Sequence, residues 1–225
     1  MKDFDVIDVV NTPGGMEQLK AMGVRNVPLV AIGDRYTFAQ NLKDVARFLG
    51  VSLNREQLPP SVLVPRYDSI LATAQRLVRQ VPVDRMGERV IPNRPRLIRP
   101  FVYHIFRIGE SFLIAYNGAE YSNMLANAEP PVEIQTPEQV VAYGQQVRDQ
   151  LSAWWTSNTD RALEKKLDTY YGVQTAHDVF ERTTWHSAQH CRQLAVVLER
   201  FGIDPDQPLQ PQQTAGLPLP EGLWE

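Results

Sequence analysis

His186 and His190 lie four residues apart and are well spaced for metal binding. Residues at i and i+4 of a helix lie one above the other on the same face. Apolar residues recur around the pair at helical spacing, so both imidazoles fall on the predicted apolar stripe, with Val179, Thr183, Leu194, Val197 and Phe201. Two neutral imidazoles on one rigid helix are well arranged to bind Zn²⁺ or a similar divalent ion.

A third histidine, His104, falls on the apolar stripe of a second predicted helix. Three imidazoles would leave one coordination position open for water or substrate, as in catalytic sites. Imidazole suits several divalent metals, of which we expect Zn²⁺ or Ni²⁺ here. The alternative is that all three are core histidines, hydrogen-bonded to backbone or water. The fourth histidine, His177, lies near a helix start and is expected at the surface or in a cap.

Four long helices are predicted to position these histidines. The first starts near Tyr67, and the second runs from Pro100, a favourable first helical residue, to about Tyr116. The third follows the N-cap sequence Thr136-Pro137, and the fourth covers about 176–201 and ends at Gly202. Together they predict an up-down four-helix bundle over residues 67–204, followed by a proline-rich, extended tail at 205–225.

A different pattern precedes the bundle. Strands are predicted at 4–10, 27–32 and 36–38, and helices at 16–22 and 42–49, the last capped by Asn41. This β-α-β-β-α order predicts a small domain over residues 1–50. Residues 51–66 contain three prolines and are predicted to be a linker. The predicted fold class is therefore α+β overall.

Composition narrows the function classes. The net charge is −3 with a pI near 5.9, so the composition shows no excess of basic residues of the kind that binds nucleic acid. No apolar run is long enough for a transmembrane helix, and the start does not read as a signal peptide. The single cysteine, Cys191, excludes an intrachain disulfide. We expect a cytoplasmic protein with neither nucleic-acid nor membrane partners.

The segment 68–204 resembles the DinB-like four-helix bundle family, which includes the bacillithiol S-transferases and is related to the mycothiol-dependent maleylpyruvate isomerases. The matching pieces are RPFVYH, ending at His104, and WHSAQHCRQL, which contains His186 and His190. The resemblance implies that these three histidines bind a divalent metal.

No general base is evident beside the three histidines. Glu181 is five residues before His186 and points elsewhere around the helix. The metal itself would then have to lower the pKa of a bound thiol or water. Cys191 is expected to be a small core residue. Three further residues could line a pocket, although packing or surface roles are favoured for each: Tyr103, Glu120 and Trp185.

Residues 4–50 resemble the second part of a glutaredoxin or thioredoxin-like fold, through the segments 22–30 and 33–41. The resemblance implies a cis peptide bond at Pro28 and a thiol- or glutathione-binding role for Val27, Pro28, Gln40 and Asn41. The chain departs from that family because no cysteine precedes residue 191, so dithiol or monothiol exchange is not expected. Three explanations stay open: a misplaced start codon, a shortened chain, or a degenerate remnant whose exposed strand edges would favour a homodimer.

Two functions follow from these patterns. The first is a divalent-metal-dependent thiol S-transferase or hydrolase that acts on a small molecule, with a low-molecular-weight thiol as cosubstrate. The second is a non-enzymatic metal-binding or interaction module carrying a redox-inactive glutaredoxin-like segment.

Overall fold

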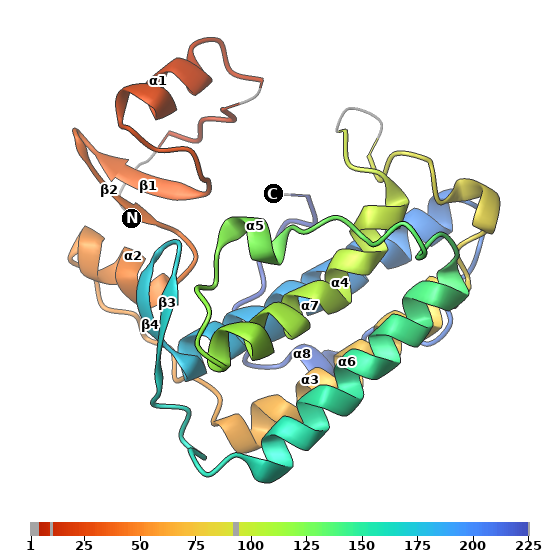
Figure 1. Ribbon diagram of the computed structural model, residues 1–225. Coiled ribbons are helices and arrows are strands. Elements are labelled where there is room, and N and C mark those ends of the chain that lie inside the picture. Colours follow the sequence, from red (N-terminus) through yellow and green to blue (C-terminus); the bar gives the residue numbers. More distant parts are fainter. Residues whose placement is uncertain (1–4, 10, 92–94, 225) are drawn as a thin grey trace. The chain divides into compact units, whose positions relative to one another are not determined.

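The structure is a computed structural model that describes residues 5–9, 11–91 and 95–224. The chain divides into two compact units, residues 1–54 and 55–225. Figure 1 shows the elements of each unit. The first unit contains α1 (Gly15–Ala21), β1 (Leu29–Ile32), β2 (Arg35–Phe38) and α2 (Leu42–Leu49).

Local turn and cap chemistry accounts for the first unit. β1 and β2 form an antiparallel hairpin in which Ile32 pairs with Arg35 across a two-residue turn, where Gly33 has a φ of 59°. The side chain of Asn41 accepts a hydrogen bond from the backbone N–H of Lys43 and so caps α2. Gly50 ends α2 in the left-handed conformation. The hairpin and α2 therefore form where the sequence predicts them.

The predicted strand over 4–10 is wrong for residues 5–9, which form no strand; Phe4 and Val10 lie outside the described residues. The side chains of Val6 and Ile7 are exposed, so this run gains neither strand pairing nor burial. The peptide bond between Val27 and Pro28 is cis, as predicted. Within the described residues this unit has only the β1–β2 hairpin as its sheet, so a thioredoxin-like segment is not confirmed.

The second unit is built on four long helices: α3 (Pro60–Arg79), α4 (Ile98–Tyr116), α6 (Pro137–Ser157) and α7 (Ala176–Arg200). The predicted N-cap at Thr136 is confirmed, and it forms a full capping box with Gln139. α3 and α4 each pack against both α6 and α7 (Figure 1). The core between these helices contains the fully buried side chains of Tyr67, Phe101, Phe106, Phe112 and Phe180.

The bundle is not up-down. Arg99 at the start of α4 binds the carbonyl of Ile134 just before α6, and Tyr116 at the end of α4 binds Asn158 just after α6. α4 and α6 therefore run in the same direction, and the order along the chain is up, down, down, up. The segment 127–136 carries the chain back along the bundle before α6 begins, as Figure 1 shows.

The predicted linker over 51–66 ends earlier than expected, because α3 begins at Pro60 rather than near Tyr67. Pro60 occupies the first helical position, where a missing N–H costs nothing, and Pro65 forgoes only one helical hydrogen bond. Several short elements were not predicted: the 3₁₀ helix η1 (Val83–Arg85), α5 (Asn123–Ala126), the antiparallel hairpin of β3 (Lys166–Thr169) and β4 (Gly172–Thr175), and α8 (Pro211–Thr214) within the tail.

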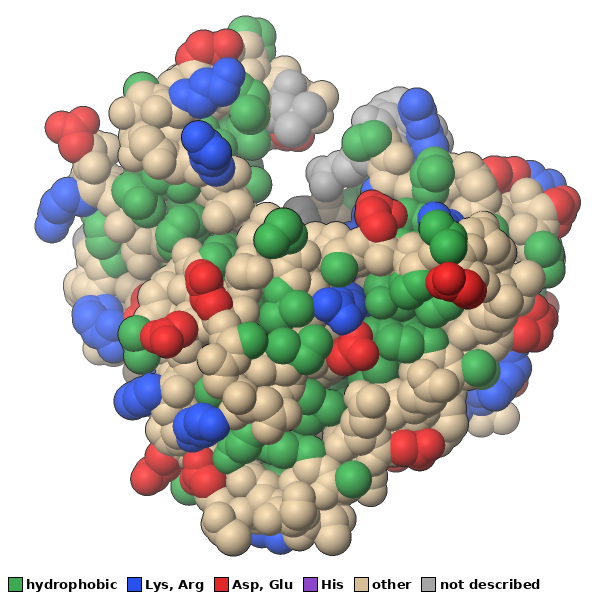
Figure 2. Space-filling model, in the orientation of Figure 1, with side chains coloured by type: hydrophobic (Ala, Val, Ile, Leu, Met, Phe, Trp, Pro, Cys, Tyr) green, Lys and Arg blue, Asp and Glu red, His purple; other side chains and the backbone are tan. Residues whose placement is uncertain are grey.

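The face drawn in Figure 2 intersperses Lys and Arg with Asp and Glu, consistent with the near-neutral net charge. None of the helices formed by the described residues combines the length and apolar character that crossing a bilayer requires.

Candidate metal centre

The structure brings the three predicted histidines together. His104, His186 and His190 each offer one ligand nitrogen, and these nitrogens all lie within 4.8 Å of one another. The ring centroid of His190 lies 5.2 Å from that of His104 and 4.6 Å from that of His186. His104 and His190 are buried, and His186 is half-buried. Among the described residues no Asp, Glu or Cys joins the group.

Helix packing places the three rings. α4 and α7 pack side by side in opposite directions, so the middle of α4 faces the middle of α7. Phe101, one turn before His104, sets its ring edge against His190 with 5.2 Å between the ring centroids. The inward stripe of each helix, which the sequence shows, is therefore the face that carries the ligands.

The hydrogen bonds of the three rings distinguish a metal centre from ordinary core histidines. His190 Nδ1 lies 2.7 Å from Gln193 Oε1. His190 Nε2 and His186 Nδ1 are both buried, and neither has a hydrogen-bond partner within 5–9, 11–91 and 95–224. Burial lowers the pKa of His104, and the nearby backbone of Ala126 in α5 opposes this shift. Two buried nitrogens without partners are costly in a plain core, and a divalent ion would satisfy both.

The electrostatic environment keeps the imidazoles neutral. Burial lowers the pKa of all three histidines, and for His190 it lowers the pKa to about 3. The positive charges of Arg96 and Arg182 lower these pKa values further. Neutral imidazoles hold the lone pairs that a metal requires, so the site does not need to lose protons before binding an ion near neutral pH.

Glu181 and Cys191, for which the sequence analysis favours no catalytic role, have structural roles. Glu181 is buried and pairs with Arg55 through both oxygens, with N–O distances of 3.0 and 2.5 Å. Cys191 is also buried, and burial raises the pKa of its thiol to about 12, so it remains a thiol near neutral pH. Neither is a base or nucleophile for this centre.

The three possible pocket residues and the fourth histidine occupy different environments. Tyr103 is buried and stacks on Tyr143, with 4.6 Å between ring centroids, which is a packing role. Trp185 is half-buried, and its ring lies 5.8 Å from that of His186, so it borders the centre. Glu120 is exposed. His177 is the second residue of α7, and its Nε2 lies 2.7 Å from the carbonyl oxygen of Leu58, which keeps it apart from the other three histidines.

The residues suggested for thiol binding lie in the first unit. The carbonyl of Val27 accepts a hydrogen bond from Gln40, at 3.5 Å, and the carbonyl of Pro28 accepts one from the backbone N–H of Ala39, at 3.0 Å. Asn41 follows as the cap of α2. Gln40 is buried, whereas Val27 is exposed. These contacts place Val27, Pro28, Gln40 and Asn41 together, and their role in thiol binding stays a prediction.

Sequence reasoning did not identify three polar residues at the centre. Arg182 lies one turn before His186 and is buried, with its guanidinium 5.7 Å from the centre of the Tyr171 ring. Arg96 lies over Phe101 at 5.5 Å, and Gln193 contacts His190 directly. Helical spacing could have found Arg182 and Gln193, at i−4 and i+3 from the two ligands, but nothing local marks Arg96.

The fold and these residues define a helical-bundle protein with a candidate centre for a divalent metal. The DinB superfamily matches residues 72–194, which is more than half of the chain, and the chain belongs to that superfamily. A solved structure of YfiT from Bacillus subtilis, described as a probable metal-dependent hydrolase with an unusual four-helix bundle topology, is similar in fold. The alignment of the two structures covers 68% of this chain and 95% of YfiT, with a TM-score of 0.50 and a sequence identity of 15%. No curated protein matches this chain.

Proposed function

We propose that this protein is a divalent-metal-dependent enzyme that uses a water or a thiol as nucleophile, and therefore acts as a hydrolase or a thiol S-transferase on a small molecule. The observation that carries the proposal is that three histidine nitrogens lie within 4.8 Å of one another. In addition, His186 and His190 each have a buried ring nitrogen with no hydrogen-bond partner among the described residues. The description of YfiT as a probable metal-dependent hydrolase supports the same class.

The roles of the residues follow from their positions. His104, His186 and His190 would hold the ion, and the remaining coordination position would be open to substrate. A divalent ion there supplies Lewis acidity and lowers the pKa of a bound water or thiol. Arg96 and Arg182 add positive charge next to the site, which favours an anionic ligand over its neutral form.

The choice between hydrolysis and thiol transfer depends on the nucleophile. Among the described residues no carboxylate joins the histidines, so no acidic side chain of the cluster is available to take a proton from water. A thiol has a pKa near 8.5 and needs far less assistance than water to ionise. This difference favours a low-molecular-weight thiol as cosubstrate, and it makes S-transfer the more specific form of the proposal.

The proposal is tested in three steps on the full-length protein. Protein purified without chelator is analysed for metal, and the site is then loaded with Co²⁺ to read the coordination from the visible spectrum. Activity is measured against ester, amide and alkyl halide substrates, with and without added thiols such as glutathione or bacillithiol. Thiol-dependent turnover that the His190→Ala variant loses supports S-transfer, and thiol-independent turnover lost in the same variant supports hydrolysis.

The alternative is a metal-binding or interaction module without catalysis. Stoichiometric metal with no turnover of any substrate in that panel would favour the module. Protein that binds no divalent ion at neutral pH would contradict both the enzyme and the metal-binding form of the module.

A further inference from the structure

A C-terminal segment, residues 220–223, is held against α7 beside the histidines. Arg192 donates to the carbonyl of Pro220 at 2.9 Å, and Gln189 donates to the carbonyls of Gly222 and Leu223 at 3.1 and 2.8 Å. Gln193 donates to the same Leu223 carbonyl at 2.7 Å. Three polar side chains of α7, at positions 189, 192 and 193, thus bind backbone carbonyls of the C-terminal segment.

The Leu223 carbonyl determines which way the Gln193 amide faces. A backbone carbonyl oxygen only accepts hydrogen bonds, so the group of Gln193 that faces it has to be the NH₂. The amide oxygen of Gln193 consequently faces His190 Nδ1, 2.7 Å away. The opposite orientation would bring two oxygens together at Leu223 and lose that hydrogen bond, and the Gln193 NH₂ would then face His190 Nδ1.

The Gln193 oxygen in turn determines the proton position on His190. An amide oxygen only accepts, so His190 Nδ1 has to carry the proton that it donates. A neutral imidazole has one such proton, which leaves the lone pair on Nε2. Nε2 is the buried nitrogen of His190 that has no partner in the part of the chain that the structure describes. The hydrogen-bond chain therefore presents a lone pair where a ligand atom is needed.

We propose that Gln193 is a positioning residue that fixes His190 as the Nδ1–H tautomer, and that the C-terminal segment holds Gln193 in the required orientation. The inference rests on the same centre as the proposed function and deepens it, because outer partners of ligating histidines set their orientation and basicity. It also gives the end of the chain a role at the metal centre, since Leu223 lies 30 positions beyond Gln193.

The first test needs no metal. Long-range ¹H–¹⁵N spectra distinguish the two histidine tautomers, and the chain contains only four histidines. In metal-free wild-type protein at neutral pH, His190 is expected as the Nδ1–H tautomer. In Gln193→Met, which keeps the length of the side chain but cannot accept the hydrogen bond, the other tautomer should appear. A wild-type spectrum with the proton on Nε2 overturns the proposal, whether or not the protein binds metal.

A second variant separates the tautomer from the anchoring of the segment. Gln193→Glu still accepts a hydrogen bond from Nδ1 but can no longer donate to the Leu223 carbonyl. We expect it to retain the Nδ1–H tautomer and to bind Zn²⁺ at least as tightly as wild type. Gln193→Met should weaken Zn²⁺ binding by about 10- to 100-fold, measured by competition with a chromophoric chelator. Equal weakening in both variants would contradict the tautomer role.

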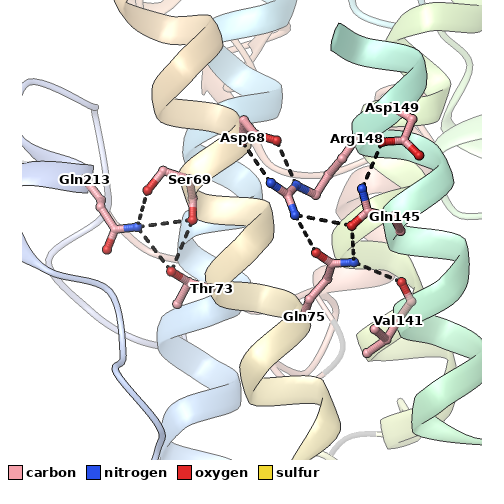
Figure 3. Close-up of polar contacts among 9 residues, drawn as sticks. All are labelled: Asp68, Ser69, Thr73, Gln75, Val141, Gln145, Arg148, Asp149 and Gln213. Carbon is pink, nitrogen blue, oxygen red and sulfur yellow. Dashed lines mark hydrogen bonds and ion pairs between the residues drawn. The ribbon is translucent and has the colours of Figure 1, made fainter.

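The matched control is Gln213→Met, the same change at a glutamine of the tail that lies away from the centre. Figure 3 shows Gln213 bonded to Ser69 and Thr73 of α3, with its amide nitrogen 2.8 Å from the Ser69 hydroxyl. This variant should leave both the His190 tautomer and the Zn²⁺ affinity unchanged.

The role of the C-terminal segment is tested by a chain that ends at Pro220. Without the Leu223 carbonyl the Gln193 amide can face either way, so His190 should show both tautomers and Zn²⁺ binding should weaken towards that of Gln193→Met. A shortened chain with the wild-type tautomer and wild-type affinity would show that Gln193 needs no help from the segment, which overturns that half of the proposal.

Discussion

Ser187 of α7 donates its hydroxyl to the backbone carbonyl of Ile105 in α4, with 2.9 Å between the two oxygens. These residues directly follow His186 and His104, so the bond fixes the two helices at the level of the metal centre. The Ser187 hydroxyl has one hydrogen, which it donates to Ile105. The Tyr67 hydroxyl of α3, 3.2 Å away, must therefore be the donor in its bond with Ser187. One serine thus links the three helices α3, α4 and α7 in a fully buried position.

The Ser187→Ala variant should lose stability and affinity together. It leaves the Tyr67 hydroxyl and the Ile105 carbonyl without their partner in the core, which costs about 1–3 kcal/mol. Urea unfolding of the metal-free protein measures this loss, and Zn²⁺ competition measures the loosening of the site. The control is Ser157→Ala at the exposed end of α6, whose hydroxyl bonds only its own helix in the described structure. Equal stability of the two variants would refute the linking role.

Substitution of the ligands should separate the histidines into two groups. His104→Ala, His186→Ala and His190→Ala should each abolish stoichiometric metal binding, because a centre with two protein ligands loses its affinity for the ion. His177→Ala should keep it, since His177 contacts the Leu58 carbonyl instead. Metal content after dialysis gives the answer. Metal lost in His177→Ala and kept in His104→Ala would mean that the ligand set is wrong.

Metal should stabilise the folded protein. The three ligands lie on two helices of the bundle, so the unfolded chain does not present them together. With free Zn²⁺ at 100 times the dissociation constant, the gain is about 2.7 kcal/mol, or about 5–10 °C in Tm for a domain of this size. Thermal unfolding with and without chelator measures the shift, and the His186→Ala variant should show none.

Stability of the metal-free protein should fall as the solution becomes acidic. The buried histidines have lowered pKa values, about 3 for His190, whereas a histidine in the unfolded chain titrates near 6.5. Below pH 6.5 the unfolded state therefore binds more protons than the folded state, and the stability present above that pH is lost as the pH falls. Between pH 7.5 and 5.5 each histidine should cost about 1 kcal/mol in urea unfolding. His190→Gln should remove its share, and a flat profile would contradict the burial of neutral rings.

Gly144 should tolerate no side chain. A Cβ added there would lie 2.6 Å from a ring carbon of Phe106, which is fully buried in the core. Gly144→Ala should therefore destabilise the protein by about 1–3 kcal/mol despite the better helix propensity of alanine. A Cβ on Gly87 would meet no described atom within 4 Å, so Gly87→Ala serves as the control and should be near neutral. Similar melting temperatures for both variants would show that Phe106 can move.

The parts of this structure that local chemistry dictates could be predicted from the sequence. Asn41 and Gly50 set the ends of α2, and the Thr136 capping box starts α6. The histidine cluster could also be predicted, because helical periodicity places His104, His186 and His190 on inward faces. Such signals act within a few residues of one another, so a single sequence displays them directly.

The rest depends on contacts between distant residues. The parallel course of α4 and α6 follows from the path of residues 127–136, which no helical periodicity encodes. The contact between Gln193 and Leu223 joins an ordinary helix residue to an irregular tail. The β3–β4 hairpin was missed because its two turn residues, Tyr170 and Tyr171, lack the glycine, asparagine or aspartate signal that marks the Gly33-Asp34 turn between β1 and β2. The strand expected at 4–10 does not form over residues 5–9, because composition alone supplies no pairing partner.

The ion pair between Arg55 and Glu181 has a practical consequence for anyone dissecting this chain. Glu181 is only 8% exposed and depends on a residue that precedes the first long helix by several positions. A bundle fragment that begins at Tyr67 would leave the buried Glu181 carboxylate without its partner Arg55. It would also lack the Leu58 carbonyl that contacts His177 and the first two turns of α3. Expression clones of the isolated bundle should therefore begin no later than Arg55.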